Sequence, residues 1–190
     1  GAKWSGLKDR LLLTAALFDI EQENVVNNVN GTPQLTGGIR SRGFESSVTV
    51  TPIKGLNLRG SIGLLDAEIV SANDDDGNRP ANTPEMTASL WASYEFQDAA
   101  SDFKGLGFGG GLTHVGNRYG DDERSFELDD YTVFDLGVWY YLPLQNESRV
   151  RFDLGVKNVT DEEYYVASGG TYRVSVGNPR TVFGSIRVEF

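Results

Sequence analysis

Side chains able to support catalysis or metal binding are few in this sequence. The 190 residues include a single histidine, His114, and no cysteine. This composition excludes disulfides, thiolate metal sites, a cysteine nucleophile and any metal site built from several histidines. A serine hydrolase would also need a serine on the same face as His114, and none is well placed. We therefore predict no catalytic site, no metal site and no cofactor.

Two carboxylates invite an acid–base interpretation. Asp135 and Asp153 lie on neighbouring segments, share a parity, and could approach each other. Arg149 and Arg151 have the same parity and offer both carboxylates a partner. An ion-pair network is the better interpretation, and we predict that the chain is not an enzyme.

The charge of the chain argues against nucleic-acid partners. Lys and Arg number 17 against 27 Asp and Glu, a formal net charge of −10, whereas phosphate recognition requires a basic surface. No apolar run is long enough for a transmembrane helix, and no signal peptide opens the chain. Hydropathy averages alone would indicate a soluble protein, but the period of the pattern does not.

The elements that must position these side chains are β-strands. In Val150–Lys157, apolar residues alternate with Arg151, Asp153 and other polar residues, so the segment predicts a strand with one apolar and one polar face. Five more segments alternate in the same way: Leu56–Leu64, Ala88–Phe96, Leu106–Leu112, Phe134–Leu142 and Val182–Phe190.

The residues opposite the apolar face favour a membrane barrel over a soluble sandwich. The apolar parity of the six segments has no charged residue, whereas the other carries Arg59, Glu95, Asp135, Arg149, Arg151, Asp153, Lys157, Arg187 and Glu189. That second parity also carries Trp91, Trp139, Tyr141 and Phe183. A lipid-facing apolar band, a mixed interior and long strands are typical of transmembrane barrels.

Two further segments, Leu11–Glu23 and Arg40–Pro52, alternate less regularly, and Gly1–Trp4 resembles the end of another strand. Arg42 falls on the apolar parity, which indicates a bulge or an exit from the membrane. We thus predict an all-β, antiparallel transmembrane barrel segment of about eight strands plus a stub. The glycines on the lumen parity, Gly105, Gly107, Gly109 and Gly111, fit either close approach of another body or bending of the wall.

Short and long connections alternate along the chain. The short ones are Ser5–Arg10, Ile53–Gly55, Gln97–Lys104 and Pro143–Ser148; the long ones are 25–38, 71–85, 117–130 and 158–180. Short periplasmic turns and long extracellular loops are typical of outer-membrane barrels. We interpret the acidic runs in the long loops as a solvated rim rather than calcium sites: 74–76, 121–123, 129–130 and 161–163.

Several motifs in order resemble the TonB-dependent outer-membrane receptors, especially the ferric-siderophore receptors. They are residues 40–45, 84–94, 114–119, 131–140, 151–165 and 177–190. The resemblance implies that residues 1–190 are the C-terminal portion of a 22-stranded barrel, without its plug domain and N-terminal strands. It also implies the outer membrane of a Gram-negative bacterium, with energy-coupled import driven by TonB through the plug.

The resemblance also implies partners and site residues. Ferric siderophore, or a similar scarce nutrient such as haem, cobalamin or a glycan, would be bound by loop aromatics and arginines. The candidates by position are Arg118, Tyr119, Tyr164, Tyr165, Tyr172 and Arg173; interfacial or loop packing is the other interpretation for each. Ile186, Val188 and Phe190 resemble the C-terminal signal read by the barrel-assembly machinery. Membrane lipid and lipopolysaccharide are further expected partners.

Two alternatives remain open from the sequence. The first is a self-contained eight-stranded outer-membrane barrel with a structural or adhesive role, since eight strands can close around their own side chains. The second is a soluble sandwich that binds carbohydrate.

Overall fold

The computed structural model describes residues 1–23, 26–29, 32–35, 37–70, 75–98, 102–144, 148–170 and 172–190, with side chains of 26–29 and 32–35 left aside. This part of the chain is all β, and no helix in it is long and apolar enough to cross a membrane. One nine-stranded antiparallel sheet dominates. Its strands are β1 (Ala2–Gly6), β2 (Leu11–Gln22), β5 (Gly38–Val50), β6 (Leu56–Val70), β7 (Met86–Glu95), β8 (Leu106–Val115), β11 (Tyr131–Pro143), β12 (Arg149–Lys157) and β15 (Thr181–Glu189).

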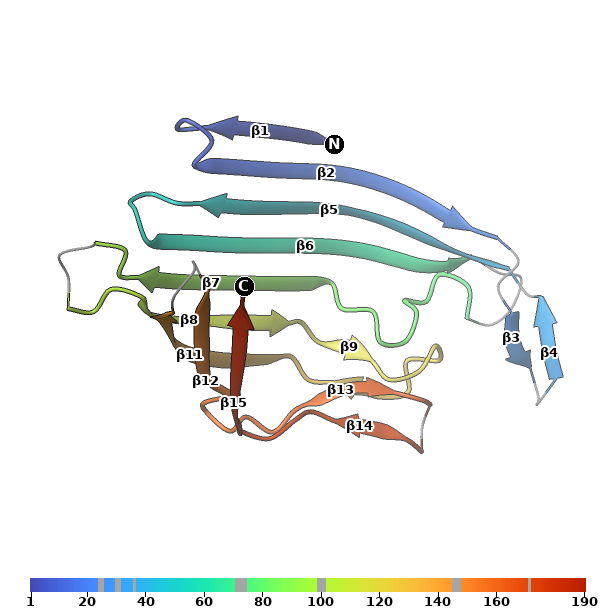
Figure 1. Ribbon diagram of the computed structural model, residues 1–190. Coiled ribbons are helices and arrows are strands. Elements are labelled where there is room, and N and C mark those ends of the chain that lie inside the picture. Colours follow the sequence, from blue (N-terminus) through green and yellow to red (C-terminus); the bar gives the residue numbers. More distant parts are fainter. Residues whose placement is uncertain are drawn as a thin grey trace.

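Each main strand pairs with the next main strand along the chain, so the sheet is a simple meander. Figure 1 shows the sheet bending, so that β12 and β15 stand across the direction of the first strands. β1 and β15 are the two edges, and the described residues contain no pairing between them. The predicted eight strands plus a stub are confirmed, whereas the self-contained closed barrel is not what the structure shows.

Connection lengths separate by end, as predicted. In Figure 1 the turns after β1, β5 and β7 lie at one end of the strands and the long loops at the other. Three of the long loops contain hairpins that the sequence pattern did not indicate. These are β3–β4 (Val26–Val29, Thr32–Leu35), β9–β10 (Arg118–Tyr119, Glu127–Leu128) and β13–β14 (Tyr165–Ser168, Val174–Val176).

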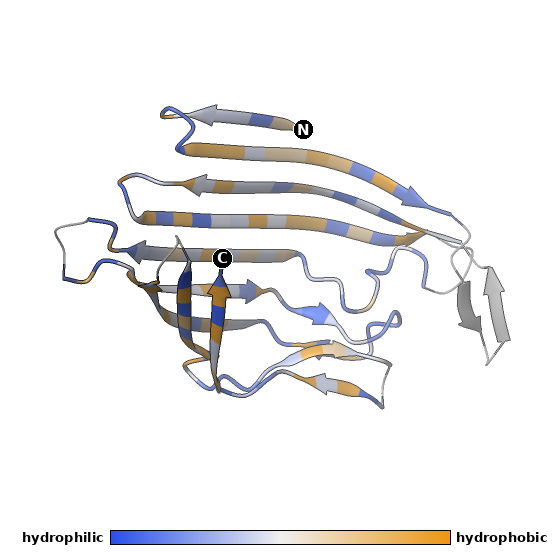
Figure 2. Cartoon of the chain, viewed as in Figure 1, coloured by the Kyte–Doolittle hydropathy of each residue, from blue (hydrophilic) through white to orange (hydrophobic). Residues whose placement is uncertain are grey.

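Strand register joins the apolar parities into one continuous face. Leu136 lies opposite Gly110 on β8 and Val156 on β12, and Val138 lies opposite Phe108 and Leu154. Figure 2 shows the resulting alternation of hydrophobic and hydrophilic residues along the strands. We call this side of the sheet the apolar face and the other side the polar face.

The apolar face is uncovered. The side chains of Leu136 and Leu154 are 53% and 54% exposed, and the buried apolar residues of the described chain are only Ala67, Ile69 and Leu128. A sandwich would cover this face with a second sheet, and no second large sheet exists among the described residues. The structure therefore disagrees with the soluble sandwich and supports a lipid-facing surface.

β6 extends six residues beyond the predicted end at Leu64, because the alternation inverts there. Leu64 lies on the apolar face in one row with Leu17 and Phe44, whereas the next row on that face is Asp19, Arg42 and Asp66. On the opposite side of the extension, Ala67 and Ile69 are buried. The register of β5 with both neighbours is unbroken, so Arg42 marks the end of the apolar face and not a bulge.

Candidate functional site

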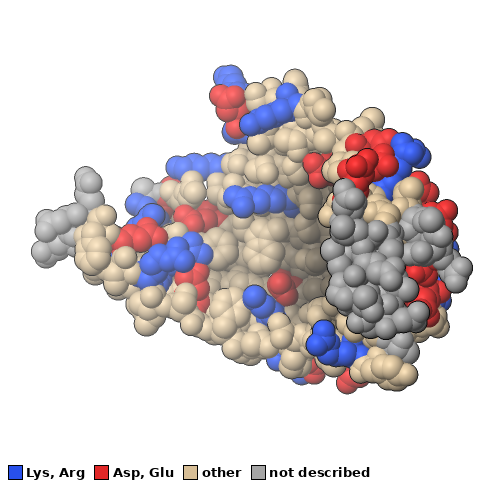
Figure 3. All heavy atoms as spheres, turned by 90° about the vertical axis from the view of Figure 1, so that its right-hand side faces the viewer, with Lys and Arg blue, Asp and Glu red and all other residues tan. Residues whose placement is uncertain are grey.

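The polar face lines a hollow. Viewed from the long-loop end, Figure 3 shows a hollow bounded by the sheet, with basic and acidic side chains inside it and around it. The charged residues of the six regularly alternating segments all lie on the polar face, as their register requires. Two regions of this side could carry function: the wall near the short turns, and the assembly formed by the long loops.

On the wall, Trp139 of β11 spans two strands. Its indole Nε1 donates a 2.9 Å hydrogen bond to Glu95 of β7, and Gly107 of β8 lies directly between them in the register. Arg151 of β12 extends these contacts, since its guanidinium lies 5.2 Å from the Trp139 ring and donates to the hydroxyl of Tyr141 at 2.7 Å. The wall is therefore a connected polar network.

The predicted ion-pair network is confirmed in part. Arg151 pairs with Asp153 at 2.6 Å, but Arg149 pairs with Glu189 of β15 and not with an aspartate. Asp135 accepts a hydrogen bond from the backbone of Asn158. Asp153 lies opposite Trp139, four residues along β11 from Asp135 and thus about 13 Å away. The two aspartates are not brought together, which removes the geometric basis for a shared-proton pair.

Gly107 and Gly111 of β8, two of the four lumen-parity glycines, accommodate aromatic rings, a role that the sequence pattern did not indicate. A Cβ added to Gly107 would overlap the indole of Trp139, and one added to Gly111 would overlap Trp91. In each case the glycine and the tryptophan are direct cross-strand partners. Because these glycines have no side chain, the aromatic ring of the residue on the neighbouring strand can lie directly over the glycine backbone. The same direct pairing joins Gly155 to Phe183 and Gly43 to Phe18.

Arg118 is the centre of the long-loop assembly. It is 3% exposed, and its guanidinium donates to the backbone carbonyls of Gly116, Asp129 and Tyr165. It also lies 5.4 Å from the ring centroid of Tyr131. Burial of a guanidinium is tolerated when its donors are satisfied. Arg118 therefore braces β9, β11 and β13, and offers little surface to a ligand.

The tyrosines among the predicted site residues occupy three different places. Tyr164 stacks on Tyr131 at 4.3 Å between ring centroids, beside Arg118. Tyr119 carries the guanidinium of Arg124 over its ring at 5.2 Å. Tyr165, at the start of β13, is half exposed. The structure thus joins Arg118, Tyr164 and Tyr165 into one cluster and leaves Tyr119 in the adjoining hairpin.

Tyr172 and Arg173 lie at the tip of the β13–β14 hairpin, away from that cluster. Tyr172 is fully exposed. Arg173 is also exposed, and its side chain folds over Gly169 in the same turn. Of the six predicted ligand-binding residues, these two and Tyr165 present the most free surface.

Hydrogen bonds between different long loops were not foreseen from the sequence. Asn82 and Ser168 exchange two hydrogen bonds, from Asn82 Nδ2 to the carbonyl and from the Ser168 amide to Oδ1, at 2.8 and 2.6 Å. Asp122 accepts from the amide of Ala81 at 2.8 Å. Single polar residues in loops carry no periodic signal, so only the folded chain reveals that the loops form one assembly.

Part of the acidic rim is structural rather than solvated. Asp121 caps its own turn by accepting from the Ser125 amide, and Asp161 pairs with Arg180. Asp74, which opens the first acidic run, lies outside the described residues. The expectation of a purely solvated rim is thus too simple for these aspartates.

Asn158 anchors the start of the longest loop. Its φ of 51° is in the left-handed region, which Asn tolerates better than most residues. It is buried, and its amide group donates to the carbonyls of Glu162 and Asn178 and accepts from the Glu162 amide.

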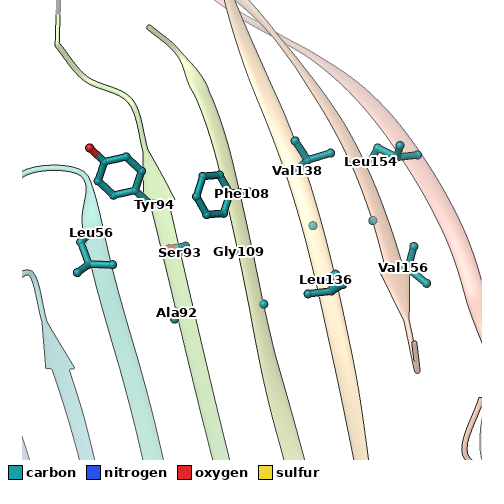
Figure 4. Close-up of a pocket in the computed structure, with 13 residues that line it drawn as sticks. Leu56, Ala92, Ser93, Tyr94, Phe108, Gly109, Leu136, Val138, Leu154 and Val156 are labelled. Carbon is teal, nitrogen blue, oxygen red and sulfur yellow. The ribbon is translucent and has the colours of Figure 1, made fainter. Parts of the chain in front are cut away.

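On the apolar face, small residues leave a shallow groove of about 570 Å³. Figure 4 shows its lining: Tyr94, Phe108, Leu136, Val138 and Leu154 surround a floor that includes Ala92 and several glycines. The lining has no charged residue and draws on β6, β7, β8, β11 and β12. This groove is part of the lipid-facing surface rather than a polar site.

The architecture and the sequence now lead to the same family. The family model for the TonB dependent receptor-like β-barrel matches residues 1–159. The chain belongs to the TonB-dependent receptor family. Its described fold, with a lipid-facing side and a polar side, is the fold of that family's barrel.

Curated relatives of this TonB-dependent receptor chain include transporters and receptors for metal chelates. It is 32% identical over 196 residues to the ferrichrome outer membrane transporter/phage receptor of Escherichia coli K12, covering all of this chain and 26% of that protein. It is also 32% identical over 195 residues to the metal-pseudopaline receptor of Pseudomonas aeruginosa UCBPP-PA14, covering all of this chain and 27% of that receptor. The chain spans about a quarter of the length of these relatives.

A solved structure agrees. BauA, the ferric preacinetobactin receptor of Acinetobacter baumannii, superposes with a TM-score of 0.79 at 26% identity, over 96% of this chain and 28% of that receptor. The resemblance predicted from the sequence motifs is therefore confirmed at the level of family and fold.

The C-terminal residues of this receptor chain lie on the apolar face. Ile186 and Val188 of β15 are opposite Phe152 and Val150, and Phe190 follows the strand with its side chain fully exposed. Their role as an assembly signal stays a prediction.

Proposed function

We propose that these 190 residues form the C-terminal part of the barrel of an outer-membrane receptor that imports ferric siderophores with energy supplied through TonB. The observation that most strongly supports this proposal is the single curved sheet, which has an uncovered, charge-free apolar face and a polar face that lines a hollow. The names of the relatives, which are ferrichrome, pseudopaline and preacinetobactin receptors, support a metal chelate as the cargo. The activity is transport, not enzymatic turnover.

Within that function, residues of the β13–β14 hairpin are the proposed ligand contacts of this segment. Tyr165, Tyr172 and Arg173 are exposed at the long-loop end, where tyrosine gives rigid amphipathic contact and arginine pairs with anionic chelate oxygens. Arg118 and Tyr164 support the hairpin from beneath, and Tyr119 belongs to the hairpin beside it. TonB would act through a plug domain, and the barrel-assembly machinery would engage Ile186, Val188 and Phe190.

The test uses the full receptor that carries this chain, in a strain lacking other siderophore receptors. Radiolabelled ferric siderophores of the hydroxamate and catecholate classes are offered, and uptake is measured with and without a functional TonB. We expect TonB-dependent uptake of at least one class. The double substitution Tyr172→Ala with Arg173→Ala should weaken binding about tenfold, through loss of a charge-assisted contact and an aromatic surface.

A matched control is Lys54→Ala, in a short turn at the opposite end of the strands. Unchanged binding in the Tyr172 and Arg173 variant would remove the hairpin from the proposed site. Absence of TonB-dependent uptake for every chelate offered, in a receptor shown to be in the outer membrane, would refute siderophore import.

A further inference from the structure

The β13–β14 hairpin, which carries the proposed ligand contacts, is a small element at the long-loop end of the strands (Figure 1). It has four residues on β13 and three on β14. A two-stranded ribbon of this size is at best marginally stable alone in water. The orientation of Tyr172 and Arg173 at its tip therefore depends on contacts between the hairpin and the neighbouring loops.

One such contact comes from Asn82, in the loop between β6 and β7. Its planar side-chain amide donates to the Ser168 carbonyl at 2.8 Å and accepts from the Ser168 amide at 2.6 Å. The N–H and C=O of one residue in an antiparallel ribbon point to the same side, and Ser168 is opposite Val174 of β14 in the register. Asn82 thus satisfies the outer edge of β13 in the way that a further strand would.

Asn82 is itself held in place by the loop that contains β9 and β10. Its backbone amide donates to the Tyr119 carbonyl at 2.8 Å, and the amide of the preceding residue, Ala81, donates to the Asp122 carboxylate. The φ of Asn82 is 60°, in the left-handed region that asparagine tolerates better than most residues. The side chain that contacts β13 therefore projects from a fixed backbone.

Ser168 connects Asn82 to the tip of the hairpin. It is 8% exposed, and its hydroxyl donates to the carbonyl of Gly170 at 2.9 Å and lies 3.4 Å from the carbonyl of Arg173. Tyr172 and Arg173 belong to the turn that these contacts close. A displacement of Ser168 therefore changes the direction in which the two exposed side chains point.

We propose that Asn82 is a positioning residue for ligand binding, which acts through Ser168 to orient Tyr172 and Arg173. A contact that is already oriented loses less conformational freedom on binding than a mobile one, so the affinity is higher. The proposal rests on the ligand role given to Tyr172 and Arg173 in the proposed function, and it adds a residue from a different loop.

The first experiment is a double-mutant cycle in the full receptor, with binding of a radiolabelled ferric hydroxamate and a ferric catecholate measured. Asn82→Gly deletes the side-chain amide, and glycine adopts a positive φ without strain. We expect about tenfold weaker binding from the loss of two hydrogen bonds. In the Tyr172→Ala, Arg173→Ala background, the further loss should be at most about twofold. An equal loss in both backgrounds would show a general effect on the fold and would overturn the proposal.

The matched control is Asn78→Gly, in the same loop. Asn78 is part-buried like Asn82, and its side chain also contacts another loop, by donating to the Asp122 carbonyl at 2.9 Å. Binding should be unchanged in this variant, and a loss as large as that of Asn82→Gly would contradict a specific role for Asn82. In case Asn82→Gly does not fold, Ser168→Ala enters the same cycle, because it deletes the hydroxyl that closes the turn.

The second experiment needs no ligand. A nitroxide spin label is attached at Val176→Cys, a 69% exposed position on β14, in a full receptor with no other cysteine. The electron paramagnetic resonance spectrum should show a more mobile label in Asn82→Gly and an unchanged one in Asn78→Gly. Equal mobility in the two variants would overturn the proposal, because Asn82 would then not hold the hairpin.

Failure of the inference and failure of the proposed function give different results. Normal binding by the Tyr172→Ala, Arg173→Ala receptor refutes the proposed contacts and, with them, the ligand role of Asn82. Weakened binding by that receptor together with normal binding by Asn82→Gly refutes only the positioning role. Absence of chelate binding by the unaltered receptor refutes the proposed cargo, and the spin label then decides whether Asn82 orients the hairpin.

Discussion

Trp139 and Glu95 are hydrogen bonded across an intervening strand, at 2.9 Å from the indole nitrogen to the carboxylate. The strand between them contributes Gly107, which is buried and has no side chain to keep the ring away from the backbone. The contact links β7, β8 and β11 at the end of the wall near the short turns. Its geometry makes Gly107 a stability determinant although this residue forms no polar side-chain contact.

Gly107→Ala should destabilise the receptor by about 1 to 3 kcal/mol, because the added methyl group overlaps the Trp139 ring and forces it off the wall. The measurement is the free energy of unfolding in urea, in lipid vesicles. Gly137→Ala is the control, since a Cβ at this position on the same face meets only a carbonyl oxygen at 3.9 Å. Equal stability of the two variants would contradict the conclusion that Gly107 makes room for the Trp139 ring.

Asn158→Ala should cost about 3 kcal/mol, because three hydrogen bonds of a buried side chain are lost and alanine is strained at positive φ. Asn158→Gly removes the hydrogen bonds but relieves the strain, and should cost less. The local measurement is hydrogen exchange at the Glu162 amide, which donates a hydrogen bond to Oδ1 of Asn158. Unchanged protection of that amide in both variants would show that the side chain does not hold the loop.

Arg118→Lys should loosen the long-loop assembly even though the charge is retained. A lysine cannot reach the carbonyls of Gly116, Asp129 and Tyr165 with one planar group. We expect cleavage by trypsin within residues 158–180 to become at least several-fold faster. The control is Arg124→Lys, because Arg124 is exposed and donates to a single carbonyl. Similar cleavage rates for the two variants would argue against a bracing role.

Leu136→Arg tests the assignment of the apolar face to lipid. A charge near the middle of a lipid-facing strand costs about 2 to 4 kcal/mol, and Leu136 lies in the centre of β11. Thr113→Arg places the same charge on the polar face and should be tolerated. Folding yield into vesicles, followed by heat-dependent gel mobility, separates the two. Equal loss of yield in both variants would show that the faces do not differ in environment.

The alternation of the sequence was enough to predict the main sheet, because a period of two assigns each residue to a face and register then follows from matching faces. It was not enough beyond Leu64, where the apolar residues of β6 switch to the other side of the sheet. Nor could it reveal Tyr131, which completes the cluster of Arg118 and Tyr164. That residue precedes the regular part of its strand, and its partners come from loops distant in sequence.

The role of the glycines beneath the aromatic rings could not be predicted from the sequence, for a physical reason. A glycine in a strand indicates only that a side chain is absent, and the pattern does not say what fills the space. Gly107 and Gly111 are explained only when register places Trp139 and Trp91 directly opposite them. The candidate ligand residues divide for a similar reason, since burial separates Arg118 from the exposed Tyr172 only in the folded chain.

The pairing of large rings with glycines has a further effect on the hollow. A tryptophan side chain perpendicular to the sheet would extend into the hollow by its full length. A ring that lies against the neighbouring strand extends into the hollow only by the thickness of the ring. Three aromatic rings therefore cover the wall without projecting into the hollow: Trp91, Trp139 and Phe183. At these positions the wall therefore gains aromatic packing without a side chain that projects far into the hollow.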